Sequence, residues 1–270
     1  MPALSWEELS PEVQHKAGLL ALEQVFDRLG KAEQARDAWQ LHETSRLAED
    51  NAATSHYRKM TVEVDYQIAS ALDHLRVVRA LAPAMPPFAP YSLVRSSIES
   101  SALGIWLQSG GTTDKRVIRL LQTQWSHRLN VNTYTLAEGA HTQTTTDWLD
   151  GQLTMTKNER GGLRQRDFKV PPPSTTNMLM ETDKQVPRRT SLSGLAAWRA
   201  CSGVTHGNHN FSHALLNERT VTLTDGTQSI ERTTSTSSLA MMMHPAIEYL
   251  EHLLALLIDH SQPRQGRPAR

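Results

Sequence analysis

The chain has 270 residues, enough for one large domain or two small ones with a sizeable core. Its 28 basic and 28 acidic side chains cancel, which excludes a large positive field as the source of strong, non-specific binding to nucleic acid or membrane. The single cysteine, Cys201, excludes an internal disulfide. The longest apolar run, 253–258, is too short to span a bilayer, and residues 1–9 lack an apolar signal core. We therefore expect a soluble, cytoplasmic protein without a membrane partner.

Apolar side chains at helical spacing predict a first helix that begins at Pro11, with Ser10 as its cap, and stops at Gly30. Residues 31–50 are rich in Ala, Gln, Glu and Arg and contain few apolar positions. This composition predicts an exposed helix, or one whose narrow apolar stripe faces a partner.

The same spacing predicts three more helices in the first half of the chain. One covers 57–78, and the prolines between Pro83 and Pro90 must end it because proline removes a backbone donor. The next covers 91–108 and is closed by two glycines, and the third covers 114–132. Several serines keep the helix over 91–108 thin, so we expect its neighbours to approach it closely.

The middle of the chain is predicted to be less regular. A threonine run weakens a helix over 142–160. Paired glycines and three consecutive prolines predict a long loop over 161–190, which is either a functional lid or disordered. Ser191 or Ser193 then caps the helix that carries Arg199.

Near the C-terminus, apolar residues among threonines flank Asp225-Gly226 and predict a hairpin over 219–233. A strong helix over 239–260 follows it. With no repeat and no clean boundary, the pattern predicts a single helical domain over 1–261 and a flexible tail over 262–270. The expected fold is mainly α: a helical bundle with a small β-hairpin inserted before the C-terminal helix.

Arg95 and Glu99 are four residues apart and lie beside the apolar stripe of the helix over 91–108. Two interpretations stay open. They form a surface ion pair worth about 0.3–0.5 kcal/mol, or a partly buried polar pair in a central groove.

Arg199 and His206 are seven positions apart, which is nearly two helical turns, so both side chains share one helix face. The pair can equally be structural, with hydrogen bonds inside a helix junction and a turn at His206-Gly207. Cys201 is expected to be a small buried residue rather than a nucleophile.

His206, His209 and His213 follow a His-x2-His-x3-His pattern that could converge on a metal if the helix were continuous, with Glu248 or His252 completing the set. Gly207-Asn208 interrupts that helix, and the sequence has no His-Glu-x-x-His motif. We therefore predict no metal site, and no motif for another cofactor is visible.

Arginine, six residues and then histidine on a late helix of an all-helical domain resembles the HEPN superfamily (higher eukaryote and prokaryote nucleotide-binding domains), whose motif is Arg, four to six residues, His. The helix of Arg95 and the phrase from Trp198 to Gly207 also look like uncharacterised bacterial proteins grouped near it. The resemblance covers about 91–216. The chain departs from the family at Ala200, where a polar residue is usual, and at Gly203, which lies inside the helix.

The resemblance implies metal-independent cleavage of RNA in a stress or defence setting, such as a toxin. His206 would be the general base or acid at the ribose 2′-hydroxyl, and Arg199 would stabilise charge on the phosphoryl oxygens. Arg95, Glu99 and His209 would line the substrate cleft. The implied partners are RNA or a nucleotide and a second copy of the chain, without a cofactor.

Two other classes of function remain. One is a non-catalytic helical module that binds a partner protein or a small ligand in the groove between the helices of Arg95 and Arg199. The other is a metal-dependent hydrolase, which the missing metal motif disfavours.

Overall fold

The structure is a computed structural model, and it describes residues 10–54, 58–137, 147, 150–151, 154–156 and 163–264. These residues form mainly helices, with one two-stranded antiparallel hairpin directly before the final helix. The mainly α fold with an inserted hairpin is therefore confirmed. In the part of the chain described, no helix has the length and apolar character needed to cross a membrane.

The helices are α1 (Pro11–Asp37), α2 (Arg46–Ala53), α3 (Met60–Leu81), α4 (Ala89–Gln108), α5 (Thr113–Ala137), α7 (Gln165–Phe168), α8 (Thr175–Thr182), α9 (Gly194–Thr205), α10 (His209–Leu215) and α11 (Thr236–Ser261). The hairpin strands are β1 (Leu216–Thr222) and β2 (Gln228–Thr234). In their register Arg219 lies opposite Glu231. The turn contains Gly226 at φ +83°, a backbone conformation that glycine adopts without strain.

The chain divides into two compact units, each assembled from three segments. The first unit comprises 1–38, 68–102 and 182–254, and the second comprises 39–67, 103–181 and 255–270. The single domain over 1–261 stays a prediction, and each unit is described by itself below.

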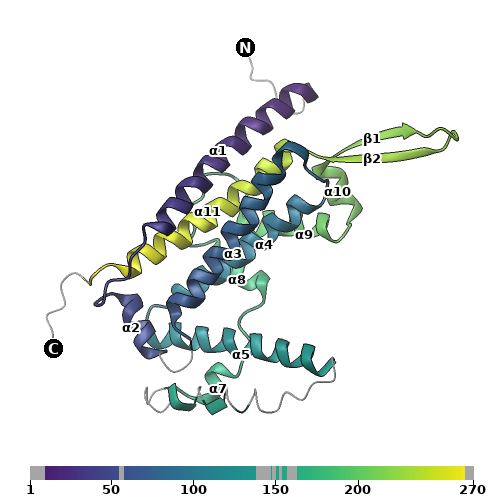
Figure 1. Cartoon of the computed structure of the whole chain (residues 1–270). Coiled ribbons are helices and arrows are strands. Elements are labelled where there is room, and N and C mark those ends of the chain that lie inside the picture. Colours follow the sequence, from purple (N-terminus) through teal and green to yellow (C-terminus); the bar gives the residue numbers. More distant parts are fainter. Residues whose placement is uncertain are drawn as a thin grey trace. The chain divides into compact units, whose positions relative to one another are not determined.

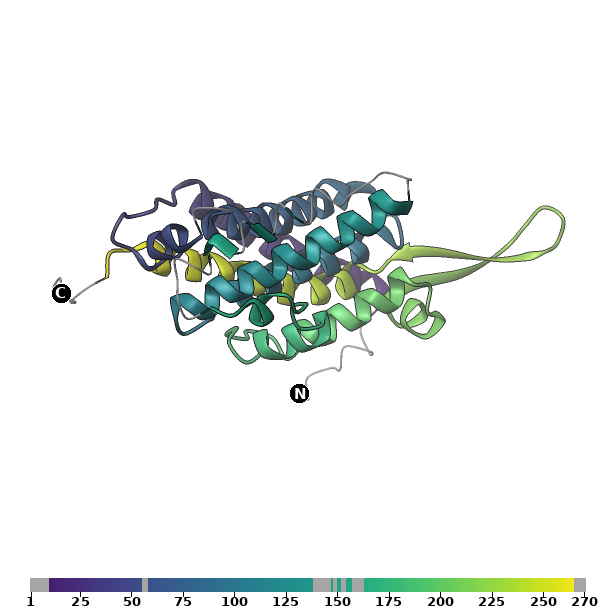
Figure 2. The same ribbon diagram turned by 90° about the horizontal axis from the view of Figure 1, so that it is seen from below.

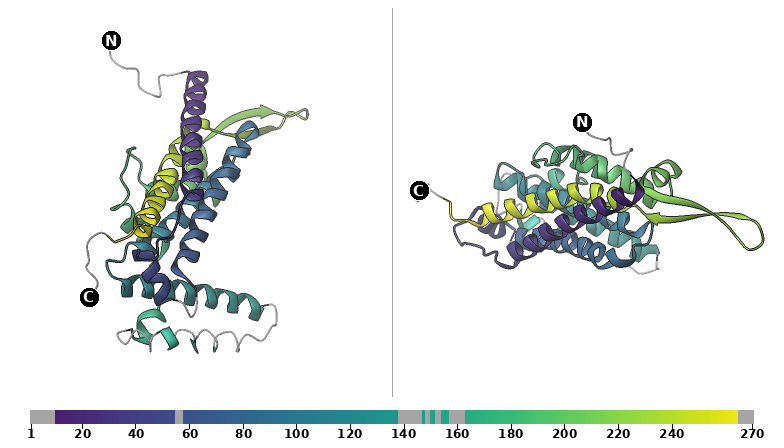
Figure 3. Two further views of the ribbon diagram at one scale, coloured as in Figure 1. Left: turned by 60° about the vertical axis from the view of Figure 1, so that its left-hand side comes forward. Right: turned by 90° about the horizontal axis from the view of Figure 1, so that it is seen from above.

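The first unit is organised by α1 and α11, which run side by side (Figures 1 and 3). Apolar side chains of α1, α3, α4, α9 and α11 are fully buried in it; they include Val25, Leu29, Leu75, Val94, Ile98, Ala197, Cys201, Val204, Met243 and Leu250. The buried Tyr91 hydroxyl donates to the Leu215 carbonyl at 2.7 Å, which fixes the end of α10 to α4. The hairpin extends away from the helices of this unit (Figure 2).

The second unit contains α2, α5 and α7. Val117 and Leu121 of α5 pack with Leu163 and Phe168 in a buried cluster. Arg116 on α5 makes a two-pronged ion pair with Asp50 of α2 at 2.5 and 2.6 Å, and both side chains are 1% exposed.

Several boundaries differ from the expectation: α3 continues to Leu81 instead of 78, α5 continues to Ala137 instead of 132, and α11 begins at Thr236 instead of 239. α1 continues through Gly30 to Asp37, because Gly30 has no close neighbour and the cost of a helical glycine, about 1 kcal/mol, is offset by burial of the flanking side chains. Residues 31–50, expected as one exposed helix, therefore contain the end of α1 and the start of α2, where Ser45 is the cap. The hairpin begins three residues earlier than 219 and ends one residue later than 233.

The segment 161–190, expected to be a long loop, contains α7 and α8 from residue 165 onward. Short helices carry little periodicity, and here they are stabilised by burial of Phe168 and Leu179. Residues 161–162 and most of the predicted helix over 142–160 lie outside the described residues.

The expected tail over 262–270 is described only at its start. Arg264 pairs with Glu49 at 2.8 Å, and Pro263 bridges to Ser45. Residues 262–264 are therefore attached to the second unit rather than free, and 265–270 lie outside the described residues.

Candidate functional site

The C-terminal end of α9 presents His206 at the surface. Ser193 caps the start of this helix by accepting from the Ala196 N–H at 3.1 Å, as expected. At the other end the Gly207 N–H donates to the Val204 carbonyl and the Asn208 N–H to the Gly203 carbonyl. This is a Schellman motif, and it needs the left-handed φ of +69° that Gly207 provides. The exposed His206 is therefore held at a defined helix terminus.

Gly203, a departure from the family pattern, has a packing role. A Cβ built on Gly203 would lie 2.2 Å from Cδ2 of Phe211. Its lack of a side chain therefore allows α10 to fold back against α9, which fixes the elbow that carries His206.

Four side chains of α4 and α9 form one polar cluster in the first unit, which we call the Arg95–His206 cluster: Arg95, Glu99, Trp198 and His206. Glu99 Oε1 accepts from Arg95 Nε at 3.0 Å and from Trp198 Nε1 at 2.6 Å. Arg95 Nη1 lies 3.2 Å from His206 Nε2, and its guanidinium stacks over the Trp198 ring at 5.6 Å from the centroid. The side chains of Arg95 and Glu99 are 25% and 35% exposed, so this ion pair is partly buried.

The Arg95–His206 contact defines the tautomer of the imidazole. A guanidinium only donates hydrogen bonds, so His206 Nε2 must accept and the ring proton lies on Nδ1. A protonated imidazole would face the guanidinium with no acceptor between them.

A second contact between the same helices supports the cluster. Ser92 Oγ of α4 lies 3.1 Å from Thr205 Oγ1 of α9, and Thr205 also donates to the Cys201 carbonyl. Cys201 is fully buried, and burial raises the pKa of its thiol to about 12. The thiol is therefore protonated near neutral pH, and its expected role as a small buried residue is confirmed.

The structure brings only some of the predicted site residues together. Arg95, Glu99 and His206 meet, but Arg199 is exposed and makes no hydrogen bond or ion pair with any described residue. His209 is also exposed, and its ring stacks on His213 at 6.2 Å between centroids instead of joining the cluster. The guanidinium that contacts His206 is thus that of Arg95.

The histidine pattern does not form a metal site in the described part of the chain, where no group of three His, Cys, Asp or Glu side chains could hold an ion. His213 is bonded to Glu218 at 3.0 Å, and His206 to Arg95. Glu248 accepts from the Arg189 N–H.

Trp198 had no predicted role in the site. A partly buried indole needs an acceptor for its N–H, but the sequence did not show that Glu99, on another helix, would supply it. Ser92 and Thr205 carried no signal, since either residue alone is common on a helix surface.

No family model matches the chain, and neither the curated proteins nor the solved structures include one with significant similarity to it.

Proposed function

We propose that this protein is a HEPN-like, metal-independent endoribonuclease that binds an RNA phosphate between Arg95 and His206. The observation that carries the proposal is the 3.2 Å contact between Arg95 Nη1 and His206 Nε2 at the surface. A phosphate oxygen is a stronger acceptor for a guanidinium than a neutral imidazole nitrogen, so it would replace this contact. Displacement would free the Nε2 lone pair next to the bound substrate.

In the proposed reaction, His206 Nε2 takes the proton of the ribose 2′-hydroxyl. The 2′-oxygen attacks phosphorus, the bond from phosphorus to the 5′-oxygen breaks, and a proton from an acid or water goes to that oxygen. The products are a 2′,3′-cyclic phosphate and a 5′-hydroxyl end. Arg95 and the exposed Arg199 stabilise the charge that builds on the phosphoryl oxygens.

Glu99 and Trp198 act as positioning residues in this scheme. Glu99 holds the Nε side of the guanidinium and Trp198 covers one face of it, so the Nη1 atom stays directed at His206. We also propose a homodimer, which rests on the HEPN resemblance, and a cytoplasmic location, which rests on the single cysteine and the short apolar runs of the sequence. In such a dimer, a second chain would add its own cationic groups next to the exposed Arg199.

A non-catalytic binding module is the second candidate. It is favoured by the pairing inside the cluster, in which Glu99 already satisfies both Arg95 Nε and Trp198 Nε1. In that case the surface between α4 and α9 would bind a ligand or partner without chemistry, and the Arg95–His206 contact would be purely structural.

The test is cleavage of a 5′-labelled single-stranded RNA with EDTA present. We expect His206→Ala to lower the rate by about 10²–10⁴ and Arg95→Ala by about 10²–10³. His213→Ala and Arg219→Ala, at side chains 71% and 77% exposed, are the matched controls and should retain full activity.

The product ends test the reaction, and the variants distinguish the proposal from contamination. The enzyme should leave 5′-hydroxyl ends that a polynucleotide kinase can label. Equal degradation by the wild type, His206→Ala and Arg95→Ala would reject catalysis by this chain. RNA binding without cleavage would favour the binding module.

A further inference from the structure

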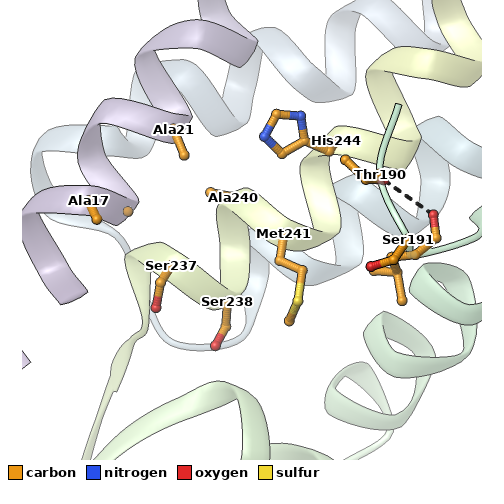
Figure 4. Close-up of a pocket in the computed structure, with 11 residues that line it drawn as sticks. Ala17, Ala21, Thr190, Ser191, Ser237, Ser238, Ala240, Met241 and His244 are labelled. Atoms are coloured by element: carbon orange, nitrogen blue, oxygen red, sulfur yellow. Dashed lines mark hydrogen bonds between the residues drawn. The ribbon is translucent and has the colours of Figure 1, made fainter. Parts of the chain in front are cut away.

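A groove of about 410 Å³ opens in the first unit between α1 and the first turns of α11, with residues 190–192 along one side (Figure 4). Its walls include Ala17 and Ala21 of α1 and Ala240 and Met241 of α11. None of its lining residues belongs to the Arg95–His206 cluster. A groove of this size is within the range of about 300–1,000 Å³ typical of small-molecule sites.

The groove exists because the two helices are pinned at two points. Near the start of α11, a Cβ on Gly18 would lie 2.4 Å from the Ser237 nitrogen, so the backbones nearly touch there. Further along, Arg28 makes a two-pronged bond to Glu251, with both distances 2.8 Å. Between these points small side chains, among them Ala21 and Ala240, line part of the gap, and the gap is left unfilled.

The segment along the side of the groove is fastened to α11. The Arg189 N–H donates to Glu248 Oε1 at 3.1 Å, and Thr190 Oγ1 donates to the Leu192 carbonyl at 3.4 Å, the dashed line in Figure 4. Ser191 and Leu192 are thereby held beside Met241 as a third wall. The groove is therefore a formed part of the fold.

His244 provides a directed polar group in this groove. Its Nδ1 lies 3.4 Å from Arg28 Nη1, and because the guanidinium only donates, Nδ1 accepts and Nε2 carries the ring proton. No described residue accepts a hydrogen bond from that Nε2–H. Burial, and next the charge of Arg28, lower the pKa of His244, so the imidazole is neutral near pH 7.

The charges behind His244 are balanced. Arg28 and Arg189 face Glu251 at 2.8 and 3.7 Å, and Glu248 lies one turn from His244. Two cations and two carboxylates carry no net charge, so this group of side chains does not favour an ionic ligand. An uncharged ligand with a hydrogen-bond acceptor is therefore the chemistry that the lining satisfies best.

We propose that this groove binds an uncharged, mainly apolar small molecule whose carbonyl oxygen accepts from His244 Nε2. The apolar body lies against Ala17, Ala21, Ala240 and Met241, and the carbonyl lies at the His244 end. Binding adds a small-molecule site to the protein and does not depend on RNA cleavage.

The probe for the test is prodan, an uncharged naphthalene ketone whose fluorescence shifts to the blue in an apolar site. We expect saturable binding to the wild-type chain with a blue shift. His244→Phe keeps a flat ring but removes the donor, and it should weaken binding about three- to tenfold. Ala17→Phe fills the groove and should weaken binding at least about tenfold.

Ala196→Phe, at an exposed alanine of α9 outside the groove, is the matched control for added bulk and should bind prodan like the wild type. Circular dichroism checks that each variant folds. If Ala17→Phe does not fold, Met241→Trp, at a side chain 47% exposed, fills the groove from its opposite wall. No saturable binding, or equal binding by the wild type, His244→Phe and the filled variant, would overturn the proposal.

Discussion

Trp198 Nε1 and Arg95 Nε donate to the same carboxylate oxygen of Glu99, the indole at 2.6 Å and the guanidinium at 3.0 Å. One acceptor thus joins α4 to α9 and fixes the guanidinium that contacts His206. Among the described residues, Arg95 is the side-chain partner of His206, and its orientation depends on an indole one helix away.

Trp198→Phe tests this arrangement. The ring that stacks on Arg95 is largely kept, but the donor to Glu99 is lost, so the free energy of unfolding should fall by about 1 kcal/mol. The loss is small because water reaches Glu99. Urea denaturation measures it, and an unchanged midpoint would mean that the indole bond does not stabilise the native state.

Gly203→Ala should destabilise the protein, although alanine is the better helix former by about 0.5–1 kcal/mol. The added Cβ would overlap the Phe211 ring. Gly30→Ala in α1, where nothing lies within 4 Å, is the control and should stabilise instead.

Phe211→Ala should rescue Gly203→Ala, because it removes the ring that the new methyl meets. A double-mutant cycle in urea therefore predicts a coupling energy of about 1–3 kcal/mol. If the effects of the two substitutions were additive, the destabilisation by Gly203→Ala would not come from overlap with the Phe211 ring.

Asp50→Ala should cost about 3–5 kcal/mol, because it leaves the guanidinium of Arg116 buried without its counter-charge. Glu231→Ala, which removes the exposed partner of Arg219, is the control and should change stability by less than about 1 kcal/mol. Similar melting temperatures for both variants would show that the buried pair contributes no more than a surface pair.

Titration of the buried His260 should make the free energy of unfolding depend on pH. Burial, and next the charge of Arg46, lower its pKa from 6.5 to about 4. Between those values the unfolded chain binds the proton and the native state does not, so stability is full above pH 6.5 and falls as the pH drops toward 4. The loss should approach about 3 kcal/mol.

His260→Gln keeps an acceptor for Arg46, which now donates to the imidazole at 3.0 Å, but it cannot titrate. Unfolding free energies of both proteins at pH 7 and pH 4.5 give the difference due to this residue. Parallel pH profiles for the wild type and His260→Gln would contradict the assignment.

Much of the fold could be predicted because its long helices carry full apolar stripes. Val64, Ile68 and Leu75 of α3 recur at helical spacing in the sequence, and all are buried. The short helices α7 and α8 could not be predicted, since tertiary contacts rather than periodicity stabilise them. Gly30 was misread as a stop because a helical glycine and a terminal glycine look alike in sequence.

The candidate site was only partly predictable for a related reason. Spacing within a helix placed Arg199 and His206 on one face, and Arg95 next to Glu99. Contacts between α4 and α9 depend on the packing of two helices, which spacing along one helix does not encode. The contact between Arg95 and His206 could therefore not be predicted from the sequence, and neither could the role of Trp198.

The most direct test of the account is the His206 imidazole in a long-range ¹H–¹⁵N NMR spectrum, recorded with and without a 2′-O-methyl RNA oligomer that lacks the attacking hydroxyl. We predict the neutral tautomer protonated on Nδ1 in the free protein, and RNA-dependent shifts of both ring nitrogens that disappear in Arg95→Ala. His206 resonances that do not move at saturating oligomer would contradict a phosphate site between Arg95 and His206.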